Sequence, residues 1–403
     1  MNYRSLGHSG LKVSEIALGS WTTYGGYVDD AEAIRIVRRA FELGINLFDT
    51  ADVYVRGGAE TLLGKALTGL PREQLVIATK VMGRVWEGPL GAGLSRKHIF
   101  DAMDQSLRRL GVDYVDLYQA HAPHAESPIE ETLRAFEDLV RMGKARYVGF
   151  SNFDREPALA RKVAEIQAAR GWDAMISSQP RYSLVDRHVE AEHAAFCAQH
   201  GLGMIVYSPV AQGVLTGKYA GGAKPAGSRA TSKFEHFLTG ENALTPENVA
   251  AASRFVSWVK ARGLPGPAPV AVAWVLSRPQ VTSAIIGASR IEQLEENVKA
   301  LEVKLTEADW REAEAAIAGA AAAGGAARSV APSARPAKAG ESATAAGGGE
   351  GRKGAAGKRA PSGGRARAAQ GNGSRGRDAA APAPRRRRAV TPARAARPAR
   401  GPR

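Results

Sequence analysis

The chain has 403 residues, of which 44% are hydrophobic, and its formal net charge is +15. Residues 321–403 hold 19 Lys and Arg against 3 Asp and Glu, so this tail carries +16 and residues 1–320 are near neutral at −1. A near-neutral body argues against a nucleic-acid-binding core, which requires a basic face. A single cysteine, Cys197, excludes an intramolecular disulfide and a multi-cysteine metal site, and its helical apolar context predicts a buried structural thiol.

The tail lacks the residues that form a hydrophobic core. It contains 27 Ala, 15 Gly and 8 Pro and no aromatic residue, and its only large aliphatic residues are Val330 and Val390. Such a composition buries too little apolar surface to offset the loss of backbone entropy. We therefore predict a folded domain over 1–320 and a disordered basic tail over 321–403. The Arg run at 385–388 indicates weak, salt-dependent binding to polyanions, or no function.

Short apolar runs rich in β-branched residues alternate with helical patterns along the body. Near-continuous hydrophobicity over four to six residues is typical of strands buried on both faces, as in parallel sheets. The longest apolar runs fall short of the ~18 residues that span a bilayer, and the N-terminal sequence lacks the apolar segment of a signal peptide. We expect a cytoplasmic protein. The eight runs lie at 16–20, 45–50, 75–80, 114–121, 146–152, 174–179, 203–208 and 283–287.

Two of the intervening helices are clearly marked. One is predicted to begin near Arg96, and the next has Pro128 in its first turn. Eight β/α units in the body fit an α/β fold of the (β/α)8 TIM-barrel type. A doubly wound sheet is the rival, but its dinucleotide-binding members carry a G-x-G-x-x-G turn after a strand. Residues 1–320 contain no such match, and the one at 349–354 lies in the tail.

Polar or very small residues end every predicted strand. Such groups are costly at the end of an apolar strand unless they converge on a site, and in a barrel all eight C-terminal ends face one mouth. After the seventh strand comes a long Gly-rich loop, which is typical of a lid or a binding loop. The strand-end residues are Gly19, Ser20 and Trp21, then Asp49, Lys80, His121, Ser151 and Asn152, Gln179, Tyr207 and Ser208, and Gly287.

Asp49, Tyr54, Lys80 and His121 together form a candidate proton-transfer set. A buried lysine beside a phenol lowers the pKa of the phenol, and a paired carboxylate keeps the lysine charged. A histidine nearby can hydrogen-bond a carbonyl oxygen on which negative charge develops. The set suits a tyrosine that protonates a carbonyl as hydride arrives. Each residue alone has an ordinary alternative: a helix N-cap, a solvated lysine or a structural histidine.

A hydride donor would bind across the same mouth. Side-chain amides and a hydroxyl can hold a carboxamide, and an aromatic ring can stack on a nicotinamide. The loops after strands seven and eight, with a helix N-terminus, commonly bind phosphate in barrels. The candidates are Ser151, Asn152 and Gln179 for the carboxamide, Tyr207 for the ring, Ser208, Gln212 and Lys218 for the pyrophosphate, and 287–297 for phosphate.

The body resembles the aldo-keto reductases over about residues 1–320, most closely the bacterial branch that also resembles potassium-channel β subunits. This resemblance implies a (β/α)8 barrel with an N-terminal β-hairpin that reduces aldehydes or ketones with NADPH. It is carried by DTADVY (49–54), ATK (78–80), GLSRKHI (93–99), LGVDYVDLYQAH (110–121), GKARYVGFSNF (143–153), YSPVAQGVLTGKY (207–219) and IIGASRIEQLEENV (285–298).

The resemblance also implies roles for individual residues. Tyr54 would be the proton donor, Lys80 and Asp49 its tuning pair, and His121 the residue that orients the carbonyl. Asp49 also counts among the cofactor contacts. The other contacts implied are Ser20 and Trp21 at the nicotinamide, Ser151, Asn152, Gln179 and Tyr207 around it, Ser208, Pro209, Val210, Gln212 and Lys218 along the pyrophosphate, and Gly287, Ser289, Gln293, Glu296 and Asn297 at the adenosine.

The resemblance implies NADPH rather than NAD as the cofactor. Arg290, the only basic residue in 287–297, can bind a 2′-phosphate through two hydrogen bonds, and its ordinary alternative is a solvated arginine at the start of a helix. The expected substrate is a small carbonyl compound. Departures from the family pattern at 55–59, Ala122 and 180–182 bear on the choice of substrate more than on the reaction. Two other functions stay open: an NADP(H)-binding regulatory subunit with little turnover, and a reductase that its basic tail tethers to polyanions.

Overall fold

Eight parallel strands close into a barrel in a computed structural model that describes residues 1–240 and 243–319. The order is β10-β3-β4-β5-β6-β7-β8-β9, and β10 pairs with β3 to complete the circle. Each predicted apolar run overlaps one strand, so the barrel is confirmed over the doubly wound sheet. The strands are β3 (Ile16–Gly19), β4 (Leu47–Asp49), β5 (Val76–Val81), β6 (Val115–Ala120), β7 (Ala145–Ser151), β8 (Ser177–Gln179), β9 (Gly203–Tyr207) and β10 (Val281–Ile286).

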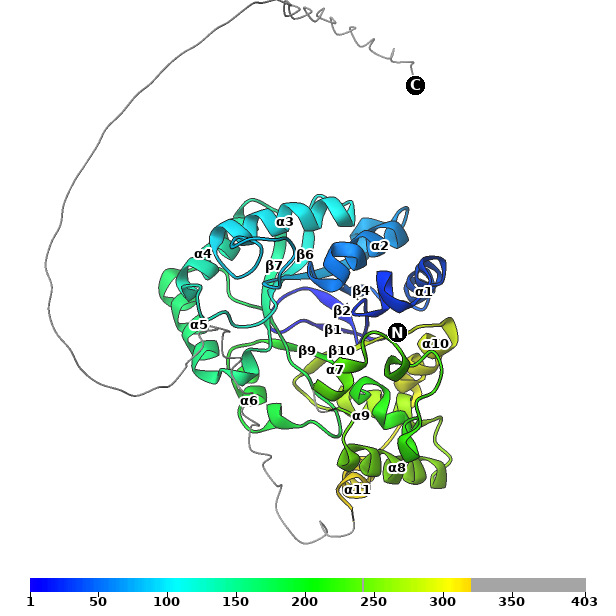
Figure 1. The fold of residues 1–403 in the computed structure, drawn as a ribbon. Helices are drawn as coiled ribbons and strands as arrows, with labels where there is room; N and C mark the ends of the chain where they lie inside the picture. Colours follow the sequence, from blue (N-terminus) through cyan, green and yellow to red (C-terminus); the bar gives the residue numbers. More distant parts are fainter. Residues whose placement is uncertain (241–242, 320–403) are drawn as a thin grey trace, which may run out of the picture. The chain divides into compact units, whose positions relative to one another are not determined.

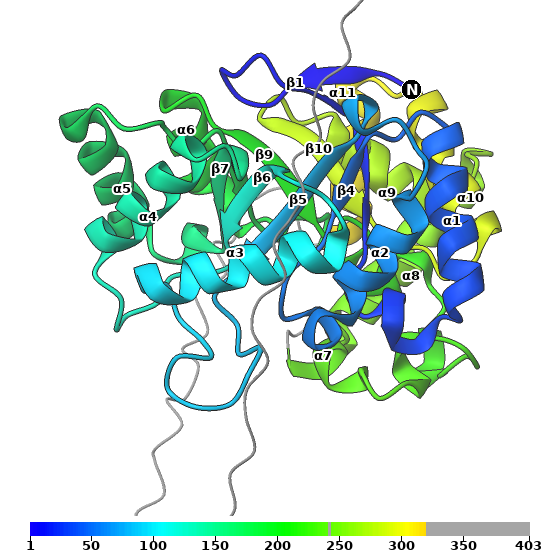
Figure 2. The ribbon, with the colours of Figure 1, turned by 90° about the horizontal axis from the view of Figure 1, so that it is seen from above.

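Helices surround the strands on the outside of the barrel (Figures 1 and 2). The helix predicted from Arg96 begins there, because the Ser95 side chain accepts a hydrogen bond from the His98 amide as N-cap. Pro128 is the N-cap of the next helix and thus lies just before its first turn. The helices are α1 (Asp30–Glu42), α2 (Gly58–Leu67), α3 (Arg96–Leu110), α4 (Ile129–Arg141), α5 (Pro157–Arg170), α6 (His193–Gln199), α7 (Glu235–Gly240), α8 (Pro246–Ala261), α9 (Pro267–Leu276), α10 (Ile291–Val298) and α11 (Glu307–Ala318).

An N-terminal hairpin, β1 (Tyr3–Ser5) and β2 (Lys12–Ser14), closes the end of the barrel at which the strands begin. Leu6 and Val13 are fully buried and pack with the apolar side chains of the barrel interior. Gly7 has a φ of +58°, and a Cβ there would lie 2.2 Å from the carbonyl oxygen of Gly201. Only glycine allows this close approach. The N-terminal hairpin that the family resemblance implies is therefore present and packs closely on the barrel.

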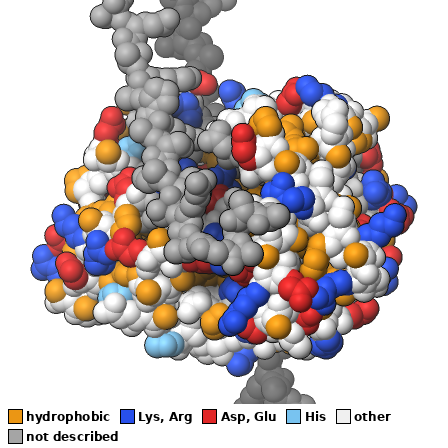
Figure 3. All heavy atoms as spheres, turned by 90° about the horizontal axis from the view of Figure 1, so that it is seen from below, with side chains coloured by type: hydrophobic (Ala, Val, Ile, Leu, Met, Phe, Trp, Pro, Cys, Tyr) orange, Lys and Arg blue, Asp and Glu red, His pale blue; other side chains and the backbone are white. Residues whose placement is uncertain are grey.

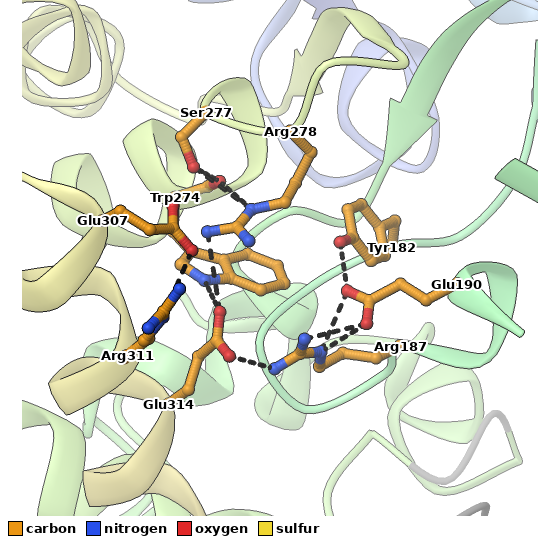
Figure 4. A network of polar contacts seen from close by, with 9 residues as sticks. All are labelled: Tyr182, Arg187, Glu190, Trp274, Ser277, Arg278, Glu307, Arg311 and Glu314. Atoms are coloured by element: carbon orange, nitrogen blue, oxygen red, sulfur yellow. Dashed lines mark hydrogen bonds and ion pairs between the residues drawn. The ribbon is translucent and has the colours of Figure 1, made fainter. Parts of the chain in front are cut away.

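The last helix, α11, is fastened to the barrel through Trp274 of α9 (Figure 4). Glu314 of α11 accepts hydrogen bonds from Trp274 Nε1 at 2.9 Å and pairs with Arg187 Nη1 at 2.8 Å. The guanidinium groups of Arg187 and Arg278 lie 5.2 and 4.7 Å from the centroid of the Trp274 ring. A cavity of about 340 Å³ beside this network touches Met204 and the first residue of β10. The cavity lies at the N-terminal ends of the strands. In barrels this end contributes to stability, whereas the active site lies at the opposite end.

The long segment after β9 differs from the structureless loop that its composition predicts. It folds into short 3₁₀ turns at Ala211–Thr216, Ala220–Gly222 and Arg229–Thr231, followed by α7. Glycines with positive φ, such as Gly217 at +77°, allow the chain to reverse between these turns. The long loop is therefore a chain of tight turns across the mouth of the barrel.

Three further expectations concern the burial of Cys197, the charge of the protein surface and membrane-spanning helices. Cys197 on α6 is buried, as predicted. The face drawn in Figure 3 carries basic and acidic side chains interspersed, in keeping with the near-zero charge of the body. Among the described helices, none is both long and apolar enough to cross a bilayer. The predicted tail at 321–403 lies outside the described residues, so its disorder and the boundary at 320 stay predictions.

Candidate active site

Lys80 ends up at the centre of the site, at the C-terminal end of β5. Its ammonium donates hydrogen bonds to Asp49 Oδ1 at 2.6 Å, to the Thr50 carbonyl at 2.8 Å and to the Tyr54 hydroxyl at 3.2 Å. The Lys80 side chain is 0% exposed and that of Asp49 is 5% exposed. Burial lowers the pKa of Lys80, and Asp49 opposes this shift. The pair is a buried, fully hydrogen-bonded ion pair, so neither a solvated lysine nor an Asp49 N-cap describes the site.

Tyr54 places its hydroxyl between Lys80 and His121. The oxygen is 3.2 Å from Lys80 Nζ and 3.4 Å from His121 Nε2, and the Tyr54 and His121 rings meet edge to face at 5.4 Å. The chain turns sharply directly after Tyr54, because Val55 and Arg56 have φ values of +51° and +52°. Bulky residues rarely adopt this left-handed conformation, and such strain gathers at functional sites.

His121 follows β6 and is held uncharged. Burial, and then the Lys80 ammonium, lower the pKa of the His121 imidazole to about 3. The ring is therefore neutral at physiological pH and is able to donate one hydrogen bond into the mouth. This geometry suits a group that orients a carbonyl, and it does not suit an acid that titrates near pH 6.5.

We expect the catalytic rate to have no acid limb from His121 between pH 5 and 8. The charged imidazolium forms only near pH 3, far below that range, so the neutral form persists throughout. NMR titration of the His121 ring signals, assigned with a His121→Asn variant, measures this directly. A titration midpoint between 5.5 and 7 contradicts the expectation.

A second layer of charge lies behind Lys80 and was not predicted. Asp52 is 0% exposed, and neither of its carboxylate oxygens has a hydrogen-bond partner among the described residues. Burial first, and then the nearby carboxylate of Glu60, raise the pKa of Asp52 well above its usual range. Glu60 is paired with Arg109 at 2.7 Å, and Asp49 is paired with Lys80. These two ion pairs already balance, so a protonated Asp52 leaves the cluster neutral.

The amide side chains predicted for a carboxamide join the same network. Gln179 Nε2 donates to Asp49 Oδ2 at 2.8 Å, and Asn152 Nδ2 donates to the His121 carbonyl at 2.9 Å. Tyr207 donates its hydroxyl hydrogen to Asn152 Oδ1, also at 2.9 Å. Asn152 has a φ of +61°, a conformation that asparagine tolerates better than most residues. The ends of β7, β8 and β9 are thereby tied to Asp49 and His121.

Three cations gather over the turns after β9. Arg229 Nη1 donates to Gln212 Oε1 at 2.7 Å, and its guanidinium carbon lies 4.5 Å from the centroid of the Trp21 ring. Burial, and then the charges of Arg229 and Arg290, lower the pKa of Lys218. Like charges held together in this way suit a polyphosphate ligand. The sequence analysis did not predict a role for Arg229. Its position in the long loop after the seventh strand was the only feature of the sequence that pointed to it.

The remaining predicted residues line the same end of the barrel. The Ser20 hydroxyl is buried without a hydrogen-bond partner among the described residues, as fits a contact to a ligand. Trp21 meets Phe237 of the loop at 4.9 Å. Ser151 Oγ donates to the Gln179 carbonyl. Directly after β9 come Ser208, Pro209 and Val210, and directly after β10 comes Gly287. The Ser289 hydroxyl donates to Gln293 Oε1. At the start of α10 or on it lie Ser289, Arg290, Gln293, Glu296 and Asn297.

Known proteins resemble the chain over this whole barrel. A model of the Aldo/keto reductase family matches residues 15–318. A putative voltage-gated potassium channel subunit beta of Schizosaccharomyces pombe is 40% identical over 314 residues, covering 74% of this chain and 88% of that protein. An L-glyceraldehyde 3-phosphate reductase of Escherichia coli K12 is 38% identical over 313 residues, covering 75% and 88%. The chain therefore belongs to the aldo/keto reductase family, as its sequence blocks predict, and is an oxidoreductase.

Proposed function

We propose that the protein reduces aldehydes or ketones to alcohols with NADPH, and that Tyr54 donates the proton. The observation that most supports this proposal is the position of the Tyr54 hydroxyl, which lies within hydrogen-bonding distance of both Lys80 and His121. The cofactor, when bound, supplies a hydride. Tyr54 gives its proton to the carbonyl oxygen, Lys80 stabilises the phenolate that remains, and Asp49 keeps Lys80 charged. Neutral His121 donates a hydrogen bond to the same oxygen.

The cofactor site proposed here follows the ends of β7 to β10. Asn152, Gln179 and Tyr207 would hold the nicotinamide, because they form one network beside Asp49. Lys218 would meet the pyrophosphate together with Arg229, which also covers the Trp21 ring. The remaining proposed contacts are Ser20, Trp21, Ser151, Ser208, Pro209, Val210, Gln212, Gly287, Ser289, Arg290, Gln293, Glu296 and Asn297.

The Arg290→Gln variant is expected to bind NADPH about tenfold more weakly and NADH unchanged. A charge-assisted hydrogen bond contributes about 1.5–3 kcal/mol, and the lower end applies because Arg290 is 62% exposed. Fluorescence titration with both nucleotides measures the two Kd values. Arg311→Gln is the matched control, since Arg311 is likewise exposed and pairs at 3.8 Å with a nearby glutamate. An equal loss of affinity for NADPH and NADH would show that Arg290 does not bind the 2′-phosphate.

The decisive experiment is NADPH oxidation, with NADH in parallel, over a panel of small aldehydes and ketones. L-glyceraldehyde 3-phosphate belongs in the panel because one relative is named for its reduction. Turnover above the rate without enzyme supports the proposal. Other relatives are named as channel subunits, so tight NADPH retention without turnover on any carbonyl would instead favour a regulatory subunit.

The proposal also covers where the enzyme works in the cell and what its basic tail at 321–403 does. We place the enzyme in the cytoplasm, with a small carbonyl compound as substrate. The +16 charge of residues 321–403 would add weak binding to polyanions that falls steeply with salt. The near-neutral barrel has no part in that contact, so reductase kinetics should not depend on it.

A further inference from the structure

His188 joins two carboxylates on the outer side of the candidate cofactor site. It opens a short 3₁₀ turn, His188–Glu190, and its Nε2 lies 2.7 Å from Asp154 Oδ2. Its Nδ1 lies 2.6 Å from Asp186 Oδ1. Carboxylates accept hydrogen bonds, so both ring nitrogens act as donors and the ring is an imidazolium.

The two carboxylates belong to different loops at the mouth. Asp154 lies in the turn Phe153–Arg155, which starts directly after Asn152 at the end of β7. Asp186 pairs with Arg181 Nε at 2.5 Å, and Arg181 is two residues beyond Gln179 at the end of β8. His188 therefore links the loop that carries Asn152 to the loop that carries Gln179. These two amides are the proposed carboxamide ligands.

We propose that His188 is a positioning residue for the cofactor, which clamps the loops after β7 and β8 so that Asn152 and Gln179 face the nicotinamide together. The inference rests on the proposed function. It adds a residue that touches neither cofactor nor substrate and acts through Asp154 and Asp186. Holding the two amides at a fixed spacing removes conformational freedom that binding would otherwise cost.

The charges around the clamp balance only when His188 is protonated. Asp154 and Asp186 carry two negative charges, His188 and Arg181 two positive ones, and the nearby His193 is kept neutral because burial lowers its pKa. Burial disfavours the His188 cation, but the two carboxylates outweigh it and raise the pKa to about 9. The usual value is about 6.5. The clamp is thus fully formed below pH 6.5 and is lost as pH rises through 9.

The test compares His188→Asn with His188→Lys in the full chain. Lysine keeps a cation for the two carboxylates, whereas asparagine does not. At pH 7 we expect His188→Asn to raise the Kd of NADPH about tenfold, as for loss of a charge-assisted contact, with kcat changed less than twofold. His188→Lys should stay within threefold of wild type. His200→Asn, at an exposed histidine directly after α6, should match wild type.

The pH dependence gives a second readout. Between pH 7 and 10 the wild-type Kd should rise more steeply than the Kd of either variant and should approach that of His188→Asn. Lys218, whose pKa is lowered, adds the same smaller rise to all three proteins. NMR titration of the His188 ring should give a midpoint near 9. An unchanged Kd in a folded His188→Asn variant overturns the clamp, as does an equal rise with pH in all variants. A wild-type protein that binds neither NADPH nor NADH would instead refute the proposed function.

Discussion

Replacing Tyr54 with Phe is expected to lower kcat for carbonyl reduction by about 10²- to 10⁴-fold, the usual contribution of a positioned general acid. The variant loses only the hydroxyl that lies between Lys80 and His121. Its ring still fills the same space, so the fold and the Kd for NADPH should change by less than twofold. Stopped-flow absorbance at the NADPH band measures the hydride step directly.

A matched tyrosine outside the site provides the control for this variant. Tyr114 lies before the first residue of β6, at the opposite end of the barrel, where its ring packs on Arg72 and Arg146. Tyr114→Phe should keep wild-type kcat. If Tyr54→Phe reduces the same aldehyde as fast as Tyr114→Phe, Tyr54 is not the proton donor.

The Lys80→Met variant is expected to lose both activity and stability. Without the ammonium, the phenolate of Tyr54 has no cation beside it, so we expect kcat to fall by about 10²- to 10⁴-fold. Removing one partner of a buried ion pair also leaves Asp49 uncompensated, which costs about 3–5 kcal/mol of unfolding free energy. Urea denaturation and steady-state kinetics measure the two effects separately.

A double variant separates these two consequences. Lys80→Met with Asp49→Asn removes both charges together, so most of the lost stability should return while kcat stays as low as in Lys80→Met. Gln179 can still hydrogen-bond the side chain at position 49. Recovery of kcat in the double variant would show that Lys80 matters only for folding. A double variant as unstable as Lys80→Met would show that the pair is not what stabilises this region.

The barrel was predictable from sequence because its strands are buried on both faces and therefore appear as continuous apolar runs. The clustering of the four proposed proton-transfer residues was predictable for a related reason: the ends of parallel strands in a barrel meet at one mouth. Lys80 could be placed next to Asp49 and Tyr54 without coordinates, since each follows or ends a strand. What set these residues apart was a polar side chain where the apolar pattern stops.

The unpredicted residues depend on how irregular segments fold. Arg229 reaches Gln212 and Trp21 only because a Gly-rich segment folds into successive tight turns, and no period in the sequence specifies them. His188 lies in an irregular stretch after β8, and its two carboxylate partners come from different loops. Asp52 was visible in the sequence, but its unpaired burial depends on packing between separate elements.

The hairpin at the base of the barrel leaves the active site with one entrance. Leu6 and Val13 close the lower end and pack with the apolar side chains of the barrel interior. Substrate and product must therefore share the upper opening. On the proposed mechanism, Tyr54 has to regain a proton after each reduction, while the alcohol product still occupies that opening. The proposed cycle is therefore ordered: the product leaves first, and Tyr54 is reprotonated afterwards.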